Sequence, residues 1–466
     1  MTAKERMAIP PQEMPQQEAH IRARNMQEVA LGYTAEMARK EAQRCLHCPT
    51  KPCVNGCPVK IDIPGFLAAA AEGDFEKALA VIRTSSLLPA VCGRVCPQER
   101  QCQMHCTVGK MFKDVAKAVA IGRVERFCAD NVAAEPTVCA SPTHKRVAVI
   151  GSGPASVTCA ADCARAGHEV TMFEAFHKTG GVLVYGIPEF RLPKRIVEKE
   201  IDSLKAMGVK IVTDFVVGKT RKLADMKKEF DAIFIGTGAG LPKFMDIEGE
   251  NLIGVFSANE YLTRANLMKA YLEEKAATPF WHGKRVAVLG GGNVAMDAAR
   301  MALRLGAEEV HLIYRRSEKE MPARVEEVHH AKEEGVVFHT LENAKRILGD
   351  ENGRVRAIEC LKYELGEPDA SGRRSPMAIP GSEFEFPVDT VVVAVGSGAN
   401  PLIAATTPEI DVDRKGHVIV DPSTRMTTMP GVFAGGDIVL GAATVILAMG
   451  EGRAAAAGIN DYLNGK

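Results

Sequence analysis

The sequence of 466 residues has no excess of charge of either sign and no long apolar run. Its 58 lysines and arginines balance 58 aspartates and glutamates, which does not indicate a surface for nucleic acid or an anionic membrane. No apolar stretch reaches the roughly 18 residues of a membrane-spanning helix. The N-terminal MTAKERMAIPPQEMPQQ lacks the apolar core of a secretory signal. We therefore expect a cytoplasmic protein of two or three domains, with neither nucleic acid nor membrane as a partner.

Cysteine is scarce except in one segment, which holds eight of the thirteen cysteines. Such crowding in a reducing compartment indicates metal ligation rather than disulfides. The first group resembles the bacterial ferredoxin run C-x2-C-x2-C-x3-C-P with two extra residues before its third cysteine, and the second group is spaced like a returning half. The spacing predicts two 4Fe–4S clusters with crossed ligation. The two groups are Cys45-x2-Cys48-x4-Cys53-x3-Cys57-Pro58 and Cys92-x3-Cys96-Pro97-x5-Cys102-x3-Cys106.

A zinc site accounts for the cysteine segment less well than iron–sulfur clusters do. A zinc ribbon requires paired C-x2-C knuckles, and only one such pair is present. His47 and His105 could ligate metal, although a histidine beside cysteine ligands more often supports the site from outside it. A helical domain over residues 1–140 is expected to hold the clusters. Small and proline residues over 129–145 are typical of a linker behind it.

A dinucleotide-binding motif follows the linker. A short apolar strand at 147–150 runs into a glycine turn and an alanine-rich helix, and the next strand, 170–173, ends at Glu174. Glycine permits close approach to a pyrophosphate, the helix N-terminus offers N–H donors, and the acidic residue suits a ribose hydroxyl. Serine at the third position of the motif could hold helix and strand further apart. The candidate FAD-binding residues of this turn are Gly151, Ser152, Gly153, Pro154, Ala155 and Ser156.

Later residues extend the flavin site. Glycines near 180 would let the backbone lie against a flat ring, and the GGD turn at 435–437 precedes a helix of small residues. Arg191 is a candidate catalytic cation, since a guanidinium near a flavin stabilises its anionic reduced ring; the alternative is a surface ion pair. The further candidate flavin contacts are Gly181, Val182, Arg191, Gly396, Gly436, Asp437 and Thr444.

The glycine motif is repeated in the second half of the chain. Its second strand ends in Arg315 and Arg316 rather than in an acid, which favours NADP(H) because guanidinium groups bind a 2′-phosphate. Two exposed arginines with no ligand are the alternative, and Arg324 is a third candidate cation. The residues of the turn are Gly290, Gly291, Gly292, Asn293, Val294 and Ala295.

The order of the motifs predicts the domain organisation. The fold class is α/β, with two Rossmann-like nucleotide-binding domains preceded by an α-helical, ferredoxin-like di-cluster domain. The FAD domain is expected at 141–260 and 391–466, with the NADP(H) domain, 261–390, inserted between its halves. Residues 345–386 are expected to form a hairpin-rich excursion.

The whole chain resembles the glutamate synthase small-subunit family of FAD- and 4Fe–4S-containing oxidoreductases. The resemblance is carried by AIPPQEMP, EAQRCLHC, GCPVKIDIPGF, LPAVCGRVCPQERQC, AVAIGRVERF, YGIPEFRLPK, GGGNVAMDAARMALRLGAEEV and YRRSEKEMPAR. It implies one cluster on Cys45, Cys48, Cys53 and Cys106. It implies a second on Cys57, Cys96, Cys102 and Glu125, which leaves Cys92 as a spare cysteine.

The same resemblance implies a function. Electron-bifurcating NADH-dependent ferredoxin:NADP+ oxidoreductases are the part of the family most similar to this sequence. They pair such a chain with a small subunit that carries FAD and 2Fe–2S and binds NAD(H), and with ferredoxin. One alternative is the NADPH-oxidising subunit of glutamate synthase with its large partner subunit, and another is an electron-input subunit of dihydropyrimidine dehydrogenase. A non-catalytic iron–sulfur sensor is disfavoured, since a sensor needs neither nucleotide motif.

Overall fold

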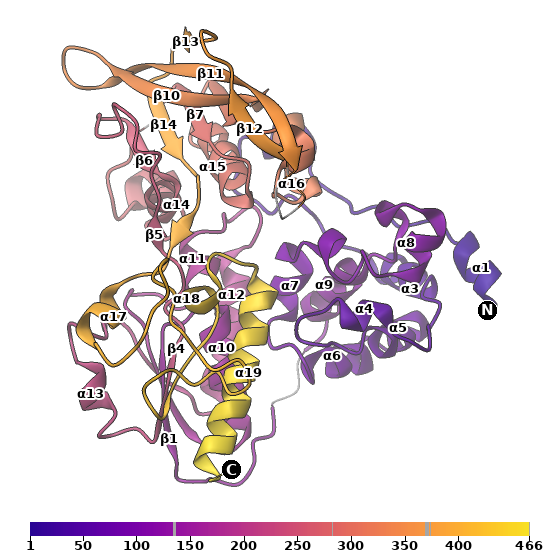
Figure 1. Cartoon of the computed structure of the whole chain (residues 1–466). Coiled ribbons are helices and arrows are strands. Elements are labelled where there is room, and N and C mark those ends of the chain that lie inside the picture. The colour runs from indigo at the N-terminus through magenta and orange to yellow at the C-terminus, as the bar shows by residue number, and fades with distance from the viewer. Residues whose placement is uncertain (134–136, 282, 369–371, 373, 466) are drawn as a thin grey trace.

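A computed structural model describes the chain except residues 134–136, 282, 369–371, 373 and 466. A helical N-terminal part lies beside two α/β units, and the long C-terminal helix runs along the lower unit (Figure 1). Among the described residues, no helix is long and apolar enough to cross a membrane. The arrangement agrees with the predicted fold class of two Rossmann-like units behind a helical domain.

The N-terminal part, which we call the cluster domain, is built from short helices. Their starts follow local rules: Thr34 and Asp74 accept hydrogen bonds from the first turns of α3 and α6, and proline lies in the first turns of α4, α5 and α7. The helices are α1 (Ala3–Ala8), α2 (Ala19–Arg22), α3 (Ala35–Gln43), α4 (Pro52–Asn55), α5 (Ile63–Glu72), α6 (Phe75–Arg83), α7 (Pro89–Val95), η1 (Gln98–Arg100), α8 (Thr107–Phe112), η2 (Val115–Lys117) and α9 (Ile121–Asn131).

The flavin unit is a parallel five-stranded sheet in the order β16-β4-β1-β2-β3. Except for the exposed edge strand β3, its strands are mostly buried apolar runs, as expected where helices cover both faces. The strands are β1 (Arg146–Ile150), β2 (Glu169–Phe173), β3 (Lys210–Val212), β4 (Ala232–Ile235) and β16 (Val432–Ala434). The helices are α10 (Pro154–Arg165), α11 (Val182–Tyr185), α12 (Lys194–Ala206), α13 (Leu223–Met226), α17 (Leu402–Thr406), α18 (Asp437–Leu440) and α19 (Val445–Leu463).

The nucleotide unit repeats this plan in the order β6-β14-β7-β8-β9. Its parallel strands are β6 (Val255–Ser257), β7 (Arg285–Leu289), β8 (Glu309–Tyr314), β9 (Val337–Thr340) and β14 (Thr390–Val393). Its helices are α14 (Ala258–Asn266), η3 (Ala270–Lys275), α15 (Asn293–Arg304), η4 (Glu318–Glu320) and α16 (Val325–Glu333). The expected hairpin-rich excursion is an antiparallel sheet of β10 (Glu342–Gly349), β11 (Val355–Pro368), β12 (Arg374–Ala378) and β13 (Phe384–Phe386).

In the structure, the chain crosses between the two units at residues other than the predicted domain boundaries. β6 and β14 pair with each other inside the second sheet, yet the boundary at 391 cuts β14 and the one at 260 cuts α14. The chain crosses between the units at β5 (Leu241–Pro242) and β15 (Ser397–Gly398), which pair antiparallel. We therefore propose that the inserted unit extends from this strand pair, because a boundary inside a helix or a buried strand would divide one core.

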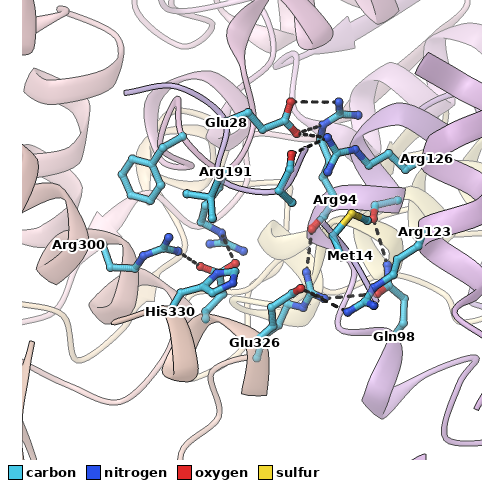
Figure 2. Close-up of a pocket in the computed structure, with 16 residues that line it drawn as sticks. Met14, Glu28, Arg94, Gln98, Arg123, Arg126, Arg191, Arg300, Glu326 and His330 are labelled. Atoms are coloured by element: carbon cyan, nitrogen blue, oxygen red, sulfur yellow. Dashed lines mark hydrogen bonds and ion pairs between the residues drawn. The ribbon is translucent and has the colours of Figure 1, made fainter. Parts of the chain in front are cut away.

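An N-terminal arm, residues 12–30, contacts the cluster domain and the nucleotide unit, and its Val29 N–H donates to the Phe190 carbonyl oxygen of the flavin unit at 2.9 Å. Arg22 is 1% exposed and forms ion pairs with Glu333 and Glu334 of α16. Farther along the arm, Glu28 binds Arg94 of α7 at 2.6 Å and Arg126 of α9 at 2.9 Å. Glu28, Arg94 and Arg126 line a cavity between the parts (Figure 2). The arm thus attaches the nucleotide unit to the cluster domain.

Candidate redox site

The first glycine turn connects β1 to α10 at the carboxyl edge of the flavin sheet. Gly151 has φ +92°, and a Cβ on it would lie 2.6 Å from the carbonyl oxygen of Gly236. Gly153 has an ordinary φ of −70°, and a Cβ there would meet no described atom within 4 Å. Glycine at 151 is therefore needed by the fold, whereas glycine at 153 leaves space beside the helix N-terminus. That space fits the pyrophosphate of a dinucleotide.

Ser156, the departure from the glycine motif, is fully buried in α10. Its hydroxyl lies within donating distance of the carbonyl oxygens of Ile150, at 3.4 Å, and Gly236, at 3.3 Å. The buried hydroxyl therefore has two backbone acceptors: Ile150 is the last residue of β1, and Gly236 directly follows β4.

Other predicted flavin residues gather around this turn. The Ser152 hydroxyl donates to the carboxylate of Glu174, and that hydroxyl accepts from the Gly180 N–H at 2.9 Å. A Cβ on Gly181 would lie 2.9 Å from Cα of Gly153. One on Gly436 would lie 2.8 Å from Cβ of Ala155, the residue after Pro154. Val182 follows Gly181 as the first residue of α11.

The GGD turn places Asp437 and Thr444 at the same edge. Asp437 begins α18, and burial raises its pKa to about 6. Thr444 caps α19 by accepting from the Leu447 N–H at 3.4 Å. Gly396 lies in the crossover, where its carbonyl oxygen accepts from Lys243 N–H at 3.0 Å, so it belongs to the junction of the two units.

The second glycine turn connects β7 to α15 with the same geometry. A Cβ on Gly290 would lie 2.4 Å from the carbonyl oxygen of Ala394, and one on Gly291 would lie 2.6 Å from the Tyr314 ring. Gly292, like Gly153, faces open space, with only Pro322 at 3.9 Å. Asn293, Val294 and Ala295 form the first turn of α15. This turn also fits a dinucleotide pyrophosphate.

The three arginines predicted for the second turn lie in different surroundings. Arg315, at the end of β8, is exposed. Arg316 is 9% exposed and donates from Nε to the carbonyl oxygen of Arg374 at 2.8 Å. Arg324 donates to the carbonyl oxygen of Arg94 at 2.7 Å and to Glu326 at 3.0 Å. Arg315 is therefore the available candidate for a 2′-phosphate, while the Arg324 guanidinium is used at the junction with the cluster domain.

Arg191, the predicted catalytic cation, is engaged by two carboxylates of the nucleotide unit. It binds Asp297 of α15 at 2.6 and 2.8 Å and Glu327 of α16 at 3.1 Å. Arg300 is a second partner of Glu327, and Figure 2 shows Arg191 and Arg300 on the same side of the cavity. Asp297 and Glu327 neutralise much of the Arg191 charge. Arg191 is thus in ion pairs, as the alternative has it, but these pairs are buried rather than on the surface. Its role toward a flavin stays a prediction.

The cysteines form two sets that match the crossed pairing. Cys45, Cys48, Cys53 and Cys106 line one pocket. Burial raises the pKa of Cys53 to about 12, with the charges of Cys45 and Cys106 adding to it. Cys48 and Cys53 are only partly buried. Within the described residues, no three His, Cys, Asp or Glu side chains converge as on a single metal ion. We call these four cysteines the outer set.

The second set contains Cys57, Cys96, Cys102 and Glu125, and we call it the inner set. Burial raises the pKa of Cys102, and the charges of Cys96, Cys57 and Glu125 add to the rise. Glu125 is 6% exposed, and its Oε1 has no hydrogen-bond partner among the described residues. Burial, with the charge of Glu200, raises the pKa of Glu125 to about 8. An unpartnered buried carboxylate beside three thiols fits a ligand of an iron–sulfur cluster.

The inner set lies against the flavin unit. Cys92, the cysteine left spare by the pairing, is 1% exposed, and its Sγ lies 3.5 Å from Sδ of Met449 in α19. Gln101 donates to Thr444 Oγ1 at 3.3 Å. The backbone after Cys57 also meets α19, where a Cβ on Gly450 would lie 3.3 Å from the Pro58 carbonyl oxygen.

Sequence reasoning missed the residues that join the parts. Glu200 of α12 accepts from the Ala90 N–H at 3.2 Å, so a flavin-unit carboxylate caps α7 of the cluster domain. Arg100 donates to carbonyls of the nucleotide unit. Both are charged helix residues whose partners are more than a hundred residues away in the chain, so no local signal distinguishes them from solvated side chains.

Two protein families match the chain. Residues 22–137 match dihydropyrimidine dehydrogenase domain II, 4Fe-4S cluster, and residues 145–452 match pyridine nucleotide-disulphide oxidoreductase. The first match bears out the iron–sulfur domain, and the second bears out FAD and NADP(H) binding.

Named relatives agree. The glutamate synthase (NADPH) small chain of Halomonas elongata is 38% identical over 456 residues, which cover 96% of this chain and 95% of the relative. Subunit beta of the NADP(+)-dependent formate dehydrogenase of Moorella thermoacetica is 41% identical over 437 residues. That match covers 89% of this chain but only 60% of the Moorella subunit.

Solved structures support the fold of the two nucleotide-binding units. Mycobacterium tuberculosis FprA in complex with NADPH has a TM-score of 0.59 at 20% identity, over 69% of this chain and 85% of FprA. Lactococcus lactis thioredoxin reductase has a TM-score of 0.51 at 20% identity, over 69% of this chain and 100% of the reductase. Since the Halomonas small chain is matched almost from end to end, the chain belongs to the glutamate synthase small-subunit family of NADPH-dependent, FAD- and 4Fe–4S-containing oxidoreductases.

Proposed function

We propose that this chain is the NADP(H)-binding subunit of an electron-bifurcating oxidoreductase. It would pass electrons between NADP(H), FAD, two 4Fe–4S clusters and ferredoxin, with a small subunit that carries FAD and 2Fe–2S and binds NAD(H). The observation that carries the proposal is the spatial order of the sites. The two glycine turns come first, and the inner set lies next to them beside α19. The outer set lies farther on, on the side of α8 away from the flavin unit (Figure 1).

The chain's residues orient the reactants in this proposal. The two turns would hold the two dinucleotides at their pyrophosphates, and Glu174 would hold the flavin ribose. A flavin accepts hydride from NADPH and releases electrons singly to iron–sulfur clusters, so no side-chain acid or base is required. Cys57, Cys96, Cys102 and Glu125 would hold the nearer cluster. The carboxylate ligand would give it a potential different from that of the all-cysteine outer cluster.

Exposed residues next to the outer set would form a docking surface for a protein that accepts single electrons. α8 begins directly after Cys106. Near its end Met111, Phe112 and Val115 are 57%, 39% and 38% exposed. Lysines at 110, 113 and 117 surround them, with one acid at 114. A basic rim around an apolar patch would suit a small acidic electron carrier.

A second candidate, the electron-input subunit of glutamate synthase, is favoured by the almost complete match to the Halomonas small chain. That function requires a large partner subunit with the amidotransferase chemistry. Purification of the native complex from the source cell, with visible spectroscopy of the partners, separates the two. A partner with FAD and 2Fe–2S, and reduction of ferredoxin by NADPH that NAD+ stimulates, supports bifurcation. A large partner with glutamine-dependent formation of glutamate contradicts it and favours the second candidate.

A further inference from the structure

The short segment Gln98–Gln101, which we call the bridging segment, connects two residues of the inner set. Cys96 lies two residues before it and Cys102 directly after it. Residues 98–100 form the 3-10 helix η1, whose preceding residue is Pro97. With so few residues between the two thiols, a displacement of the bridging segment displaces them.

The bridging segment is bonded to a loop of the nucleotide unit, residues 321–325. Arg100 donates to three successive carbonyl oxygens, at 2.8 Å to Met321, 2.9 Å to Pro322 and 3.3 Å to Ala323. Glu99 accepts from the Val325 N–H at 3.3 Å.

Arg324 strengthens the same junction. Its guanidinium donates to the Gln98 side chain at 3.4 Å and to the carbonyl oxygen of Arg94 at 2.7 Å. Figure 2 shows Arg94, Gln98 and Glu326 at one end of the cavity between the parts. The loop therefore depends on the cluster domain for much of its hydrogen bonding.

The loop in turn lies against the second glycine turn. Its Ala323 N–H donates to the carbonyl oxygen of Gly291 at 3.2 Å, and the Arg324 N–H donates to the Asn293 side chain at 2.9 Å. Pro322 is the group nearest to the open position at Gly292. A nucleotide in that space would contact the loop that Arg100 holds.

We propose that the bridging segment couples NADP(H) occupancy of the second turn to the reduction state of the inner cluster, with Arg100 as the positioning residue. This inference rests on the proposed function, in that the turn binds NADP(H) and the inner set holds a cluster. A planar guanidinium fork serves several carbonyls at once, which a lysine ammonium does not. Coupling between two equilibria is reciprocal. If bound NADP+ shifts the reduction equilibrium of the inner cluster by a given factor, reduction of the cluster shifts the affinity for NADP+ by the same factor.

The test uses the purified, cofactor-loaded protein with Arg100→Ala and Arg100→Lys. Arg39→Ala, an exposed arginine of α3 in the same domain, is the matched control. Two quantities are measured: the Kd of NADP+ by equilibrium titration, and the midpoint potential of the inner cluster by EPR-monitored titration with and without saturating NADP+. Loss of the Arg100 bonds is expected to weaken NADP+ binding about ten-fold. It should also abolish the NADP+-induced shift of the potential, with an intermediate result for Arg100→Lys.

The outcomes are distinguishable. An unchanged Kd and an unchanged potential shift in Arg100→Ala overturn the inference. A weaker Kd with a full potential shift overturns the coupling and leaves Arg100 with a structural role in the loop. Failure of the proposed function would appear in the wild-type protein itself, as absent NADP+ binding or an absent EPR signal from the inner set. Unchanged cofactor content in every variant excludes misfolding.

Discussion

The two nucleotide-binding units follow one plan but surround their glycine turns differently. The first turn is enclosed: Gly181 lies against Gly153, Gly436 lies against Ala155, and α19 packs along α10 so closely that a Cβ on Gly452 would meet the Ala155 carbonyl. The second turn has the 321–325 loop beside it and an exposed arginine, Arg315, at the end of its second strand. Enclosure suits a cofactor that stays bound, and exposure suits a substrate that must leave after each turnover.

The largest expected effect comes from filling the open position of each turn. Gly153 and Gly292 have ordinary backbone angles and free space at Cβ, so valine should be compatible with the fold while blocking the pyrophosphate. We expect Gly153→Val to be purified with less than about a tenth of its FAD, since close backbone approach is lost. Flavin absorbance per protein measures this.

Gly292→Val is the matched control for that change. It should retain FAD and lose reduction of the flavin by NADPH. Loss of FAD in both variants, or in neither, would break the comparison between an enclosed and an exposed turn.

A smaller effect is expected from the charge that distinguishes the two strand ends. Arg315→Glu gives the nucleotide unit the acid that the flavin unit has at Glu174. Loss of a charge-assisted bond to the 2′-phosphate should lower kcat/KM for NADPH about ten- to a hundred-fold, with little change for NADH. Flavin-linked reduction of ferricyanide with each nucleotide measures the ratio. An unaltered ratio would assign the phosphate contact to other residues.

Acid should loosen the nucleotide unit before the flavin unit. Burial and the charge of Arg300 lower the pKa of His330 to about 4, with Glu327, Glu326 and Arg22 as the other charged neighbours. The unfolded histidine, with its pKa near 6.5, binds a proton first as the pH falls. This residue's contribution to stability is therefore intact above about pH 6.5 and is lost towards pH 4.

Hydrogen exchange at pH 5 and pH 7 tests that prediction. The protection factors of amides in α16 and the arm, which correct for the slower intrinsic exchange in acid, should be several-fold lower at pH 5 than at pH 7. Those of α10 should be unchanged, because His330 Nε2 lies 2.8 Å from the Gln16 side-chain oxygen of the arm and makes the effect local. His330→Gln should remove most of the difference. An equal fall in the protection factors of α10 would contradict a local cause.

The smallest effect is expected at the last position of the glycine motif, which is Ser156 in the first turn and Ala295 in the second. The Ser156 hydroxyl makes two long bonds to backbone carbonyls. Ser156→Ala should change the free energy of unfolding by less than about 1 kcal/mol and leave FAD content unaltered. Chemical denaturation followed by flavin fluorescence measures both, and a cost well above that value would make the hydroxyl a structural requirement.

The sequence allowed prediction of those features whose causes are local. Glycine turns after buried strands, proline at helix starts and the cysteine spacing each depend on neighbouring residues, and the structure has the two strand–turn–helix units and two cysteine sets. The partners of Arg191 and Arg324 could not be inferred, because Asp297 and Arg94 are 106 and 230 residues away in the chain. Such pairs form only when separate units pack together, and no periodicity indicates them.

The N-terminal arm also has a consequence for biosynthesis. Arg22 is separated from Glu334 by 312 positions, so the ribosome completes the cluster domain and the first half of the flavin unit before Arg22 has its partners on α16. At about 5–20 residues per second this interval lasts roughly 15–60 seconds. During that time Arg22 and its neighbours must remain in water or bound to a chaperone. Docking of Arg22 on α16 is therefore a late step of maturation, and it requires that the nucleotide unit has folded.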